Sequence, residues 1–297
     1  MYHNPVLLKE CIAGLDINPA GIYVDVTFGG GGHSRAILEH LTTGHLYAFD
    51  QDEDAANNAF DDPRFTFIQQ NFRFLKNFMQ LHRVHHLDGI LADLGVSSHQ
   101  FDTPEKGFST RYDGRLDMRM CQGSAVDAAT VVNTYDVDAL LRVMKNYGEL
   151  QNAYNIVMEI VKAREVSPID TTAELREVVQ GCLPRGKENK TLAQIFQALR
   201  IEVNNELEVL SLLLSQCAEL LRPGGRLVVM SYHSLEDRLV KNYMKTGNLD
   251  GKEEKDFFGN SLSPYKLITR KPIMPTDEEV SVNNRARSAR LRIAEKK

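Results

Sequence analysis

Three aspartates and a run of glycines have the spacing of a nucleotide-binding site. The glycine run, residues 29–32, directly follows an apolar, β-branched segment, and Asp50 comes about twenty residues later. Glycines adopt positive φ angles and allow a ligand to touch the backbone, while a carboxylate at that distance binds ribose hydroxyls in such folds. Asp25 and Asp93 likewise end apolar segments. The chemistry indicated is the binding of a nucleotide-like cofactor beside carboxylates.

The pattern alone leaves the ligand class open. Ser34 occupies the position of the last glycine in the dinucleotide fingerprint G-x-G-x-x-G, which counts against a nicotinamide-dependent oxidoreductase without excluding it. A loose glycine loop is a second alternative, and the presence of Asp50 counts against it. Each aspartate taken singly is also explained as a cap of a helix or turn, but that explanation is poor for all three together.

The elements that must position these residues form an α/β pattern. Strands are predicted at 22–27, 45–49, 65–68 and 88–93, and helices at 34–41, 55–60 and 74–81. This alternation predicts a parallel sheet flanked by helices, and in such sheets the ligand crevice lies outside the carboxyl ends of the strands. The glycine run and the three aspartates are therefore expected on one rim.

Later segments are predicted to complete the sheet. Residues 227–231 are predicted to form a buried strand. Ser231 at its end and His233 just after it would then lie at the edge of the sheet. From position alone His233 is equally explained as a catalytic residue or as a packed, hydrogen-bonded histidine. Segments 265–269 and 290–293 are predicted as an antiparallel pair of strands at the sheet edge.

From Asp102 the α/β alternation gives way to helical spacing for roughly a hundred residues. Thr171-x-x-Glu174 is a capping box that opens one of these helices, and Asn205 is predicted to cap the helix that begins the return to the sheet. The sequence therefore predicts an α/β domain made of residues 1–101 and 205–297, with an all-α inserted domain at residues 102–204.

Composition narrows the function classes. Of the 297 residues 42% are hydrophobic, yet no apolar run approaches the length of a membrane span, and the start lacks the features of a signal peptide. The four cysteines include no C-x-x-C pair, which suits a reducing compartment. His82, His85 and His86 are three and four residues apart but have no further ligand beside them, so a solvated helix end is expected. We expect a cytoplasmic protein with no membrane partner and no metal; the sequence indicates no oligomeric state.

The net charge of −5 gives no reason to expect a nucleic-acid partner. The distribution of basic residues along the chain does give one. Residues 285–297 contain six basic residues against the single acid Glu295, and Arg111, Arg115 and Arg119 form a smaller basic set in mid-chain. A solvated face is the ordinary explanation for such runs. The alternative, contact with a nucleic acid, makes Arg285 and Arg287 candidates as well.

Six motifs run in order along nearly the whole chain. They are Thr27-Phe-Gly-Gly-Gly-Gly-His-Ser34, Asp93-Leu-Gly-Val-Ser-Ser98, Leu116-Asp-Met-Arg-Met120, Phe196-Gln-Ala-Leu-Arg-Ile201, Ser231-Tyr-His-Ser-Leu-Glu-Asp-Arg238 and Arg285-Ala-Arg-Ser288. Together they resemble the RsmH family, also called MraW. The resemblance implies a Rossmann-like methyltransferase domain with a helical insertion, S-adenosylmethionine as cofactor, and a cytidine amine in the decoding region of bacterial 16S ribosomal RNA, within the small ribosomal subunit, as substrate.

The resemblance also implies roles for individual residues. Gly31, Gly32 and His33 would hold the methionine part of the cofactor, Asp50 the ribose, Phe72 the adenine, and Asp93 with Gln100 the region around the transferred methyl. A carboxylate suits two vicinal hydroxyls, and an aromatic ring suits an adenine face.

Methylation of a cytosine amine makes one chemical demand. The nitrogen lone pair is delocalised into the ring, so an acceptor must bind an N–H while the nitrogen becomes tetrahedral. Asp93, with Ser97 or Ser98 nearby, is the candidate, and His233 is a further catalytic candidate. The base must also leave the stack to reach the pocket.

Three departures from the family pattern concern the RNA side. His99 and Asn284 stand where the family usually has proline, and residues 189–194 replace a common His-Pro-Ala-Thr-Arg segment. The insertion is therefore expected to contact RNA through other basic residues, namely Lys187, Lys190 and Arg200. A non-catalytic RNA-binding assembly factor that keeps the fold is the remaining alternative.

Overall fold

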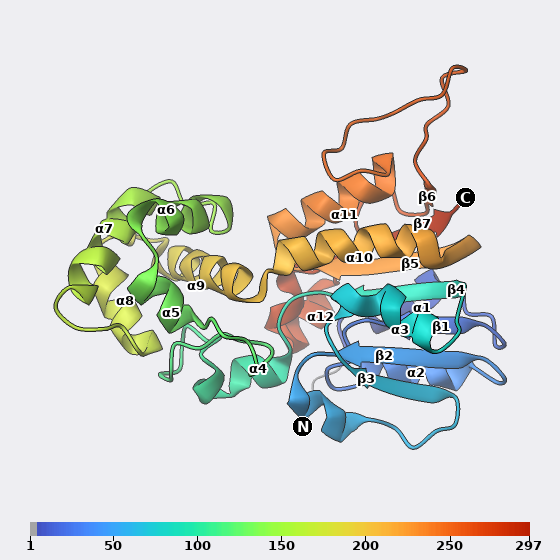
Figure 1. Cartoon of the computed structure of the whole chain (residues 1–297), viewed down its shortest axis with the longest axis horizontal. Helices are drawn as coiled ribbons and strands as arrows, with labels where there is room; N and C mark the ends of the chain where they lie inside the picture. Colours follow the sequence, from blue (N-terminus) through green and yellow to red (C-terminus); the bar gives the residue numbers. More distant parts are fainter. Residues whose placement is uncertain (1–4) are drawn as a thin grey trace. The chain divides into compact units, whose positions relative to one another are not determined.

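The computed structural model describes residues 5–297, and the chain forms two compact units (Figure 1). Of the described residues, the sheet unit comprises residues 5–95 and Leu207–Lys297, and the helical unit comprises Val96–Glu206. The chain thus divides after Gly95 and after Glu206, whereas the sequence predicts the boundaries after residues 101 and 204.

The sheet unit is built on seven strands in the order β3-β2-β1-β4-β5-β7-β6. They are β1 (Ile22–Asp25), β2 (His45–Asp50), β3 (Phe65–Gln69), β4 (Leu87–Asp93), β5 (Leu221–Ser231), β6 (Tyr265–Leu267) and β7 (Arg290–Lys296). Neighbours from β3 through β5 are parallel, while β7 is antiparallel to both β5 and β6. The strand order reverses between β1 and β4, which confirms a Rossmann-like sheet with its switch point there.

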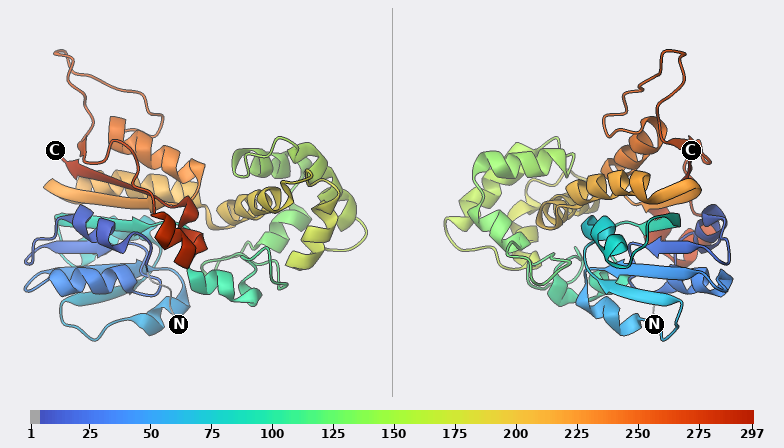
Figure 2. Two further views of the ribbon diagram at one scale, coloured as in Figure 1. Left: turned by 180° about the vertical axis from the view of Figure 1, so that it is seen from behind. Right: turned by 45° about the vertical axis from the view of Figure 1, so that its right-hand side comes forward.

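Helices cover both faces of this sheet (Figure 2). The helices of the unit are α1 (Leu8–Leu15), α2 (Gly32–His40), α3 (Leu75–Leu81), α10 (Glu206–Leu220), α11 (Ser234–Thr246) and α12 (Asp277–Val282). Side chains of α3, α10 and α11 share one buried cluster with the strands, and side chains of α1 and α2 share another. The sheet is therefore buried on both faces, as its long apolar strands require.

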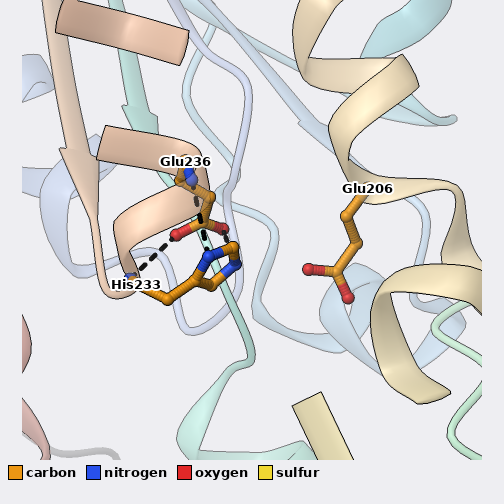
Figure 3. A group of neighbouring side chains, drawn as sticks. All are labelled: Glu206, His233 and Glu236. Carbon is orange, nitrogen blue, oxygen red and sulfur yellow. Dashed lines mark hydrogen bonds and ion pairs between the residues drawn. The ribbon is translucent and has the colours of Figure 1, made fainter. Parts of the chain in front are cut away.

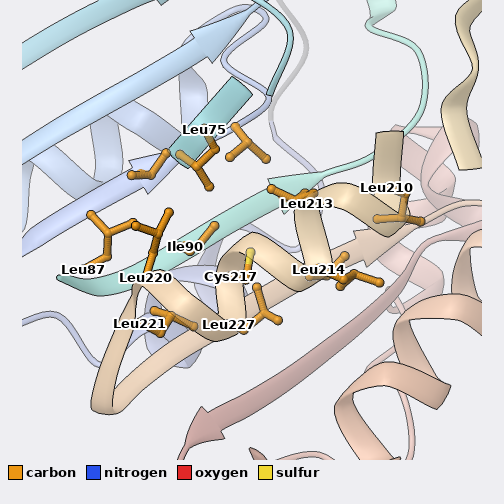
Figure 4. Close-up of a cluster of buried hydrophobic side chains, with 14 of the residues drawn as sticks. Leu75, Leu87, Ile90, Leu210, Leu213, Leu214, Cys217, Leu220, Leu221 and Leu227 are labelled. Atoms are coloured by element: carbon orange, nitrogen blue, oxygen red, sulfur yellow. The ribbon is translucent and has the colours of Figure 1, made fainter. Parts of the chain in front are cut away.

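Helix α10 shows how the sequence produces this packing. Leu210, Leu213, Leu214 and Cys217 are spaced three, four and seven residues from the first, so they share one helix face. All four are buried in the cluster that includes Ile90 of β4 (Figure 4). Burial of each leucine contributes about 1.5–3 kcal/mol, so this face fixes the helix on the sheet.

The helical unit has its own core. Its elements are α4 (Ser98–Asp102), η3 (Pro104–Lys106), α5 (Ala128–Thr134), α6 (Val137–Asn146), α7 (Ala153–Arg164), α8 (Thr172–Gln180) and α9 (Glu188–Asn204). Apolar side chains of α5 to α9 form one buried cluster. The capping box predicted from Thr171 and Glu174 is confirmed at the start of α8. An isolated β-bridge joins Arg115 and Thr171.

Several predicted elements differ in detail. The helix predicted at 55–60 is a 3-10 helix, η1 (Glu53–Asn58), because the short acidic segment lacks an apolar face for an α-helix. Strand β5 begins at Leu221 rather than at residue 227, and its register with β4 shifts between Leu87 and Gly89. The predicted pair of edge strands is confirmed as antiparallel, with β7 placed between β5 and β6.

Two further features are the histidines that follow α3 and the length and polarity of the helices. Helix α3 ends at Leu81, and His82, His85 and His86 are exposed beyond it, as predicted for a solvated end. Within residues 5–297, no helix has both the length and the apolar character that crossing a membrane requires.

Candidate active site

The glycine turn between β1 and α2 is packed against side chains at the position of a Cβ on Gly31 and has open space at the position of a Cβ on Gly29. Gly29 and Gly31 have φ angles of 49° and 75°, a left-handed conformation that favours glycine. A Cβ at Gly31 would lie 2.9 Å from the ring of Phe60, whereas a Cβ at Gly29 would have no atom within 4 Å. The turn therefore packs tightly at Gly31 and leaves the backbone of Gly29 approachable.

Asp25 anchors this turn from inside the protein. Its buried carboxylate accepts hydrogen bonds from Ser34 Oγ at 2.7 Å and from the Thr27 amide at 3.0 Å. Desolvation raises its pKa despite these donors. Ser34, which takes the place of the last glycine of a dinucleotide fingerprint, thus ties the first turn of α2 to the end of β1.

Asp50 connects the end of β2 to the same turn. Its Oδ2 accepts a hydrogen bond from the Gly29 amide at 2.7 Å, and its Oδ1 accepts one from the Asp52 amide at 2.9 Å. The side-chain amide of Asn58 donates to the Gly29 carbonyl at 3.0 Å. Desolvation raises the pKa of Asp50 to about 6. These hydrogen bonds engage both the N–H and the carbonyl of Gly29. Each carboxylate oxygen of Asp50 still has a lone pair free to accept a further hydrogen bond.

Phe72 lies one strand further along the same edge. It begins the short helix η2 (Phe72–Phe74) that follows β3, and β3 pairs with β2 so that Gln69 stands opposite Asp50. Its ring is half-buried and packs in part against the core of the sheet unit. The carboxyl ends of β1, β2 and β3 thus present the glycine turn, Asp50 and Phe72 in succession.

Asp93 ends β4 and is held through its backbone and its side chain. Its amide donates to Thr27 Oγ1 at 2.7 Å, and Tyr232 Oη donates to its Oδ1 at 2.9 Å. His33 Nδ1 lies 3.8 Å from its Oδ2. Desolvation raises the pKa of Asp93 to about 6, although His33 and Tyr232 act in the opposite direction. The result is a carboxylate that can exchange a proton near neutral pH.

His33 lies in the first turn of α2 with its ring buried. Its Nε2 is 3.1 Å from the carbonyl oxygen of Val6. A carbonyl only accepts hydrogen bonds, so Nε2 carries a proton and Nδ1 faces Asp93. The ring therefore joins the segment before α1 to the end of β4.

His233 is the N-cap of α11 (Figure 3). Its Nδ1 accepts a hydrogen bond from the Glu236 amide at 3.4 Å, and its Nε2 lies 3.2 Å from Glu236 Oε1. The other carboxylate oxygen of Glu236 accepts the amide of Tyr232 at 2.9 Å. His233 and Glu236 thus fix the start of α11, and with it the backbone that carries Tyr232.

Three predicted site residues belong to the helical unit. Ser97 and Gln100 form the capping box of α4: Ser97 Oγ accepts the Gln100 amide at 3.2 Å, and Gln100 Oε1 accepts the Ser97 amide at 3.1 Å. Ser98 is the first residue of that helix. Both Ser97 and Gln100 therefore have a local structural role at the start of α4.

Two of the predicted RNA-binding arginines make bidentate ion pairs within the helical unit. Arg119 donates through Nε and Nη2 to the two carboxylate oxygens of Asp117, at 2.8 and 2.7 Å. Arg200 does the same with Glu206, at 2.8 and 2.9 Å, and both of these side chains are largely buried. These guanidinium groups chiefly hold the helical unit together.

The other predicted arginines are exposed. Arg115 is 65% exposed and pairs with Asp127 at 2.9 Å, while Arg111 lies on the surface of the helical unit. Arg285 and Arg287 are exposed in the 3-10 helix η4 (Asn284–Ser288), directly before β7. The structure thus leaves these four side chains on the surface.

Tyr232 and Thr27 were not predicted as site residues, yet both hold Asp93. Each lies just beyond the carboxyl end of a strand, β5 and β1 respectively. That position is the signal that could have identified them, because the ends of parallel strands meet on one rim.

A family model and several relatives agree on one family. The model of the MraW methylase family matches residues 1–297. Proteins called "Ribosomal RNA small subunit methyltransferase H" are 59% identical in Flavobacterium johnsoniae (99% of this chain, 98% of the relative), 56% in Phocaeicola vulgatus (100% and 98%) and 57% in Cytophaga hutchinsonii (100% of both). Among solved structures, an rRNA methylase from Streptococcus thermophilus aligns with a TM-score of 0.40 at 13% identity, over 97% of this chain and 92% of that chain.

Proposed function

Because the chain belongs to the MraW methylase family, we propose that it methylates the exocyclic N4 amine of a cytidine in the decoding region of 16S ribosomal RNA. The chain is a small-subunit ribosomal RNA methyltransferase, and its methyl donor is S-adenosylmethionine. The cytidine, its amine and the decoding region are proposed from the six sequence motifs. The geometry around Asp93 is the observation that carries this proposal.

The residues beside the glycine turn fit the parts of the cofactor. Each oxygen of Asp50 accepts one backbone N–H and keeps a lone pair for a ribose hydroxyl. The half-buried ring of Phe72 offers a face to adenine. Gly31, Gly32 and His33 would hold the methionine part. The cofactor, when bound, supplies a methyl group activated by a sulfonium centre.

Asp93 meets the demand of amine chemistry. A carboxylate that accepts an N–H of the cytosine amine stabilises the positive charge that develops on the nitrogen, and can then take the proton. The pKa of Asp93, raised to about 6, leaves it ionised in most molecules at pH 7 yet basic enough for this role. Tyr232 donates to the carboxylate itself, and Thr27 accepts the backbone amide of Asp93. Roles for Ser97, Ser98, Gln100 and His233 in the same reaction rest on the sequence alone.

RNA contact is proposed for the exposed arginines. Arg285 and Arg287 in η4 and Arg111 in the helical unit can bind phosphates, and so can Arg115, which is exposed although it pairs with Asp127. Arg119 and Arg200 are less exposed, and each is held by a bidentate pair with a carboxylate. The helical unit is accordingly proposed as an RNA-recognition domain. The target cytosine must leave its stack to reach Asp93. We place the reaction in the cytoplasm, where bacterial small subunits are made.

One experiment tests the function directly. The protein and methyl-labelled S-adenosylmethionine are incubated with small subunits, and separately with free 16S RNA, from a strain that lacks the modification, and the label is mapped to a nucleotide. We expect label on the N4 of one decoding-region cytidine. A label at another base would refute the cytidine assignment. No label on either substrate would favour the alternative of a non-catalytic assembly factor, while the family match leaves no case for an oxidoreductase.

A further inference from the structure

The hydroxyl of Tyr232 donates a hydrogen bond to the carboxylate that the reaction needs. The distance from Tyr232 Oη to Asp93 Oδ1 is 2.9 Å. Asp93 ends β4 and stands opposite Met230 of the neighbouring parallel strand, two residues before Tyr232. The two side chains therefore meet at the same end of adjacent strands, although 139 residues separate them in the sequence.

Tyr232 is itself held from two sides. Its amide donates to Glu236 Oε2 at 2.9 Å, which links it to the first turn of α11. Its ring lies beside Gly95, where a Cβ would be 3.3 Å from Tyr232 Cδ2. Gly95 has a φ of 99°, so glycine serves both the backbone conformation and the space for the ring. The hydroxyl is thus aimed by a fixed ring rather than by a mobile side chain.

The groups around Asp93 act on its charge in opposite directions. They are His33 of α2, Tyr232 after β5, Asp25 of β1, Glu236 of α11 and Cys11 of α1. The carboxylates of Asp25 and Glu236 disfavour a third negative charge, and the thiol of Cys11 stays neutral because burial raises its pKa. His33 favours the charge but lies 3.8 Å away, beyond hydrogen-bond distance. Tyr232 makes the direct hydrogen bond.

We propose that Tyr232 is a positioning residue that orients the Asp93 carboxylate and keeps it ionised near neutral pH, which leaves Oδ2 to accept the substrate amine. This inference rests on the proposed role of Asp93. Desolvation and the charge of Asp93 raise the pKa of Tyr232 well above its usual 10, so its hydroxyl remains a donor throughout the working pH range. A hydrogen bond donated to a carboxylate stabilises the ionised form.

The substitution Tyr232→Phe removes the hydroxyl and keeps the ring beside Gly95. We expect the midpoint of the Asp93 titration, followed by carbon-13 NMR of the protein without RNA and assigned with Asp93→Asn, to move upward by about one pH unit. The single-turnover methylation rate should then fall about fivefold at pH 6 and about twofold at pH 7, and recover by about pH 9. Recovery at high pH is a result that a merely structural role would not produce.

Tyr265→Phe is the matched control. The ring of Tyr265 is buried on β6, and its hydroxyl has no hydrogen-bond partner among residues 5–297. Its loss should leave both the Asp93 titration and the pH profile unchanged. An unchanged Asp93 titration in Tyr232→Phe, or a rate loss that is equal at all pH values, would overturn the proposal. Failure of the wild-type protein to label a cytidine would count instead against the proposed function, because the NMR titration needs no RNA.

Discussion

The amide of Gly29 donates a hydrogen bond to Asp50 Oδ2 over 2.7 Å. One carboxylate therefore shapes the glycine turn after β1 and also stands at the end of β2, where a ribose would bind. Cofactor binding and the local fold of the turn depend on the same side chain. Asp93 ends β4, which lies on the other side of β1, and its carboxylate instead lies beside Tyr232 and His33.

This difference predicts unequal effects of two substitutions on cofactor affinity. Asp50→Ala removes the ribose acceptor and frees the Gly29 amide, so we expect the dissociation constant for S-adenosylmethionine to rise tenfold or more, about 1.4 kcal/mol. Asp93→Ala should raise it less while abolishing turnover. Isothermal titration calorimetry and single-turnover rates measure the two effects. Equal losses of affinity would contradict the separate roles assigned to Asp50 and Asp93.

The glycine turn gives a second pair of unequal substitutions. Both Gly29 and Gly31 have positive φ, so alanine at either should cost about 1 kcal/mol of backbone strain. At Gly31 the new Cβ would also meet the rings of Phe60 and Phe28 at 2.9–3.0 Å, whereas at Gly29 it meets nothing. We expect Gly31→Ala to lower the melting temperature clearly more than Gly29→Ala. Similar melting temperatures would mean that the rings move aside without cost.

Much of the sheet follows from local sequence patterns. The apolar segments before Asp25, Asp50 and Asp93 predict β1, β2 and β4, and the order of strands and helices predicts their parallel arrangement. The position of β7 between β5 and β6 could not be predicted from these patterns. Two antiparallel strands at the edge of a sheet have the same local sequence pattern whichever of them is the outermost strand. Asn205, predicted as an N-cap, instead takes a left-handed conformation at the end of α9, and α10 begins at the next residue.

The site could be predicted only as far as strand ends reveal it. Asp50 and Asp93 were identified because each follows an apolar strand. The contacts of His33 with Val6 and of Tyr232 with Asp93 span 27 and 139 residues. Such contacts depend on tertiary packing and leave no mark in the spacing of the sequence. The same holds for Arg200, whose carboxylate partner Glu206 lies beyond the end of its helix.

The raised pKa of Asp93 predicts that this residue reduces stability. Between about pH 4 and pH 6 the folded protein retains a proton that the unfolded chain has released, so stability from this group falls as pH rises and its full cost is present above pH 6. With 24% of the side chain exposed, the cost is about 1–2 kcal/mol. In Asp93→Asn the amide oxygen can accept from Tyr232 and the amide N–H can face His33 Nδ1.

We therefore expect Asp93→Asn to be inactive but more stable than wild type by about 1–2 kcal/mol at pH 8, with the difference vanishing near pH 4. Urea unfolding without cofactor at a series of pH values measures this. Asp62→Asn is the control of opposite sign: Arg64 lowers the pKa of Asp62 to about 2, so that variant should be less stable at pH 8. A stability difference for Asp93→Asn that does not change with pH would rule out this explanation.

The arginines of the helical unit separate structural from RNA-binding roles. Arg200→Gln leaves Glu206 largely buried without its bidentate partner, so we expect a loss of about 3 kcal/mol in unfolding free energy. Arg111→Gln removes an exposed charge and should change stability by less than about 0.5 kcal/mol. Thermal unfolding compares them. If the Arg200→Gln protein were as stable as wild type but bound RNA more weakly, the result would show that Arg200 contacts RNA.

Arg285 and Arg287 are predicted to contact phosphates, and salt dependence tests this specifically. Each lost phosphate contact reduces the slope of log affinity against log salt by about 0.7 for a single strand. The variant with both changed to glutamine should therefore bind 16S RNA more weakly and with a slope smaller by about 1.4, while S-adenosylmethionine affinity stays unchanged. The charge-matched control changes Lys252 and Lys255, two exposed lysines in the segment between α11 and β6, to glutamine. If the slope is unaltered in the double variant, η4 is a solvated surface, and the proposed RNA contact must come from the helical unit.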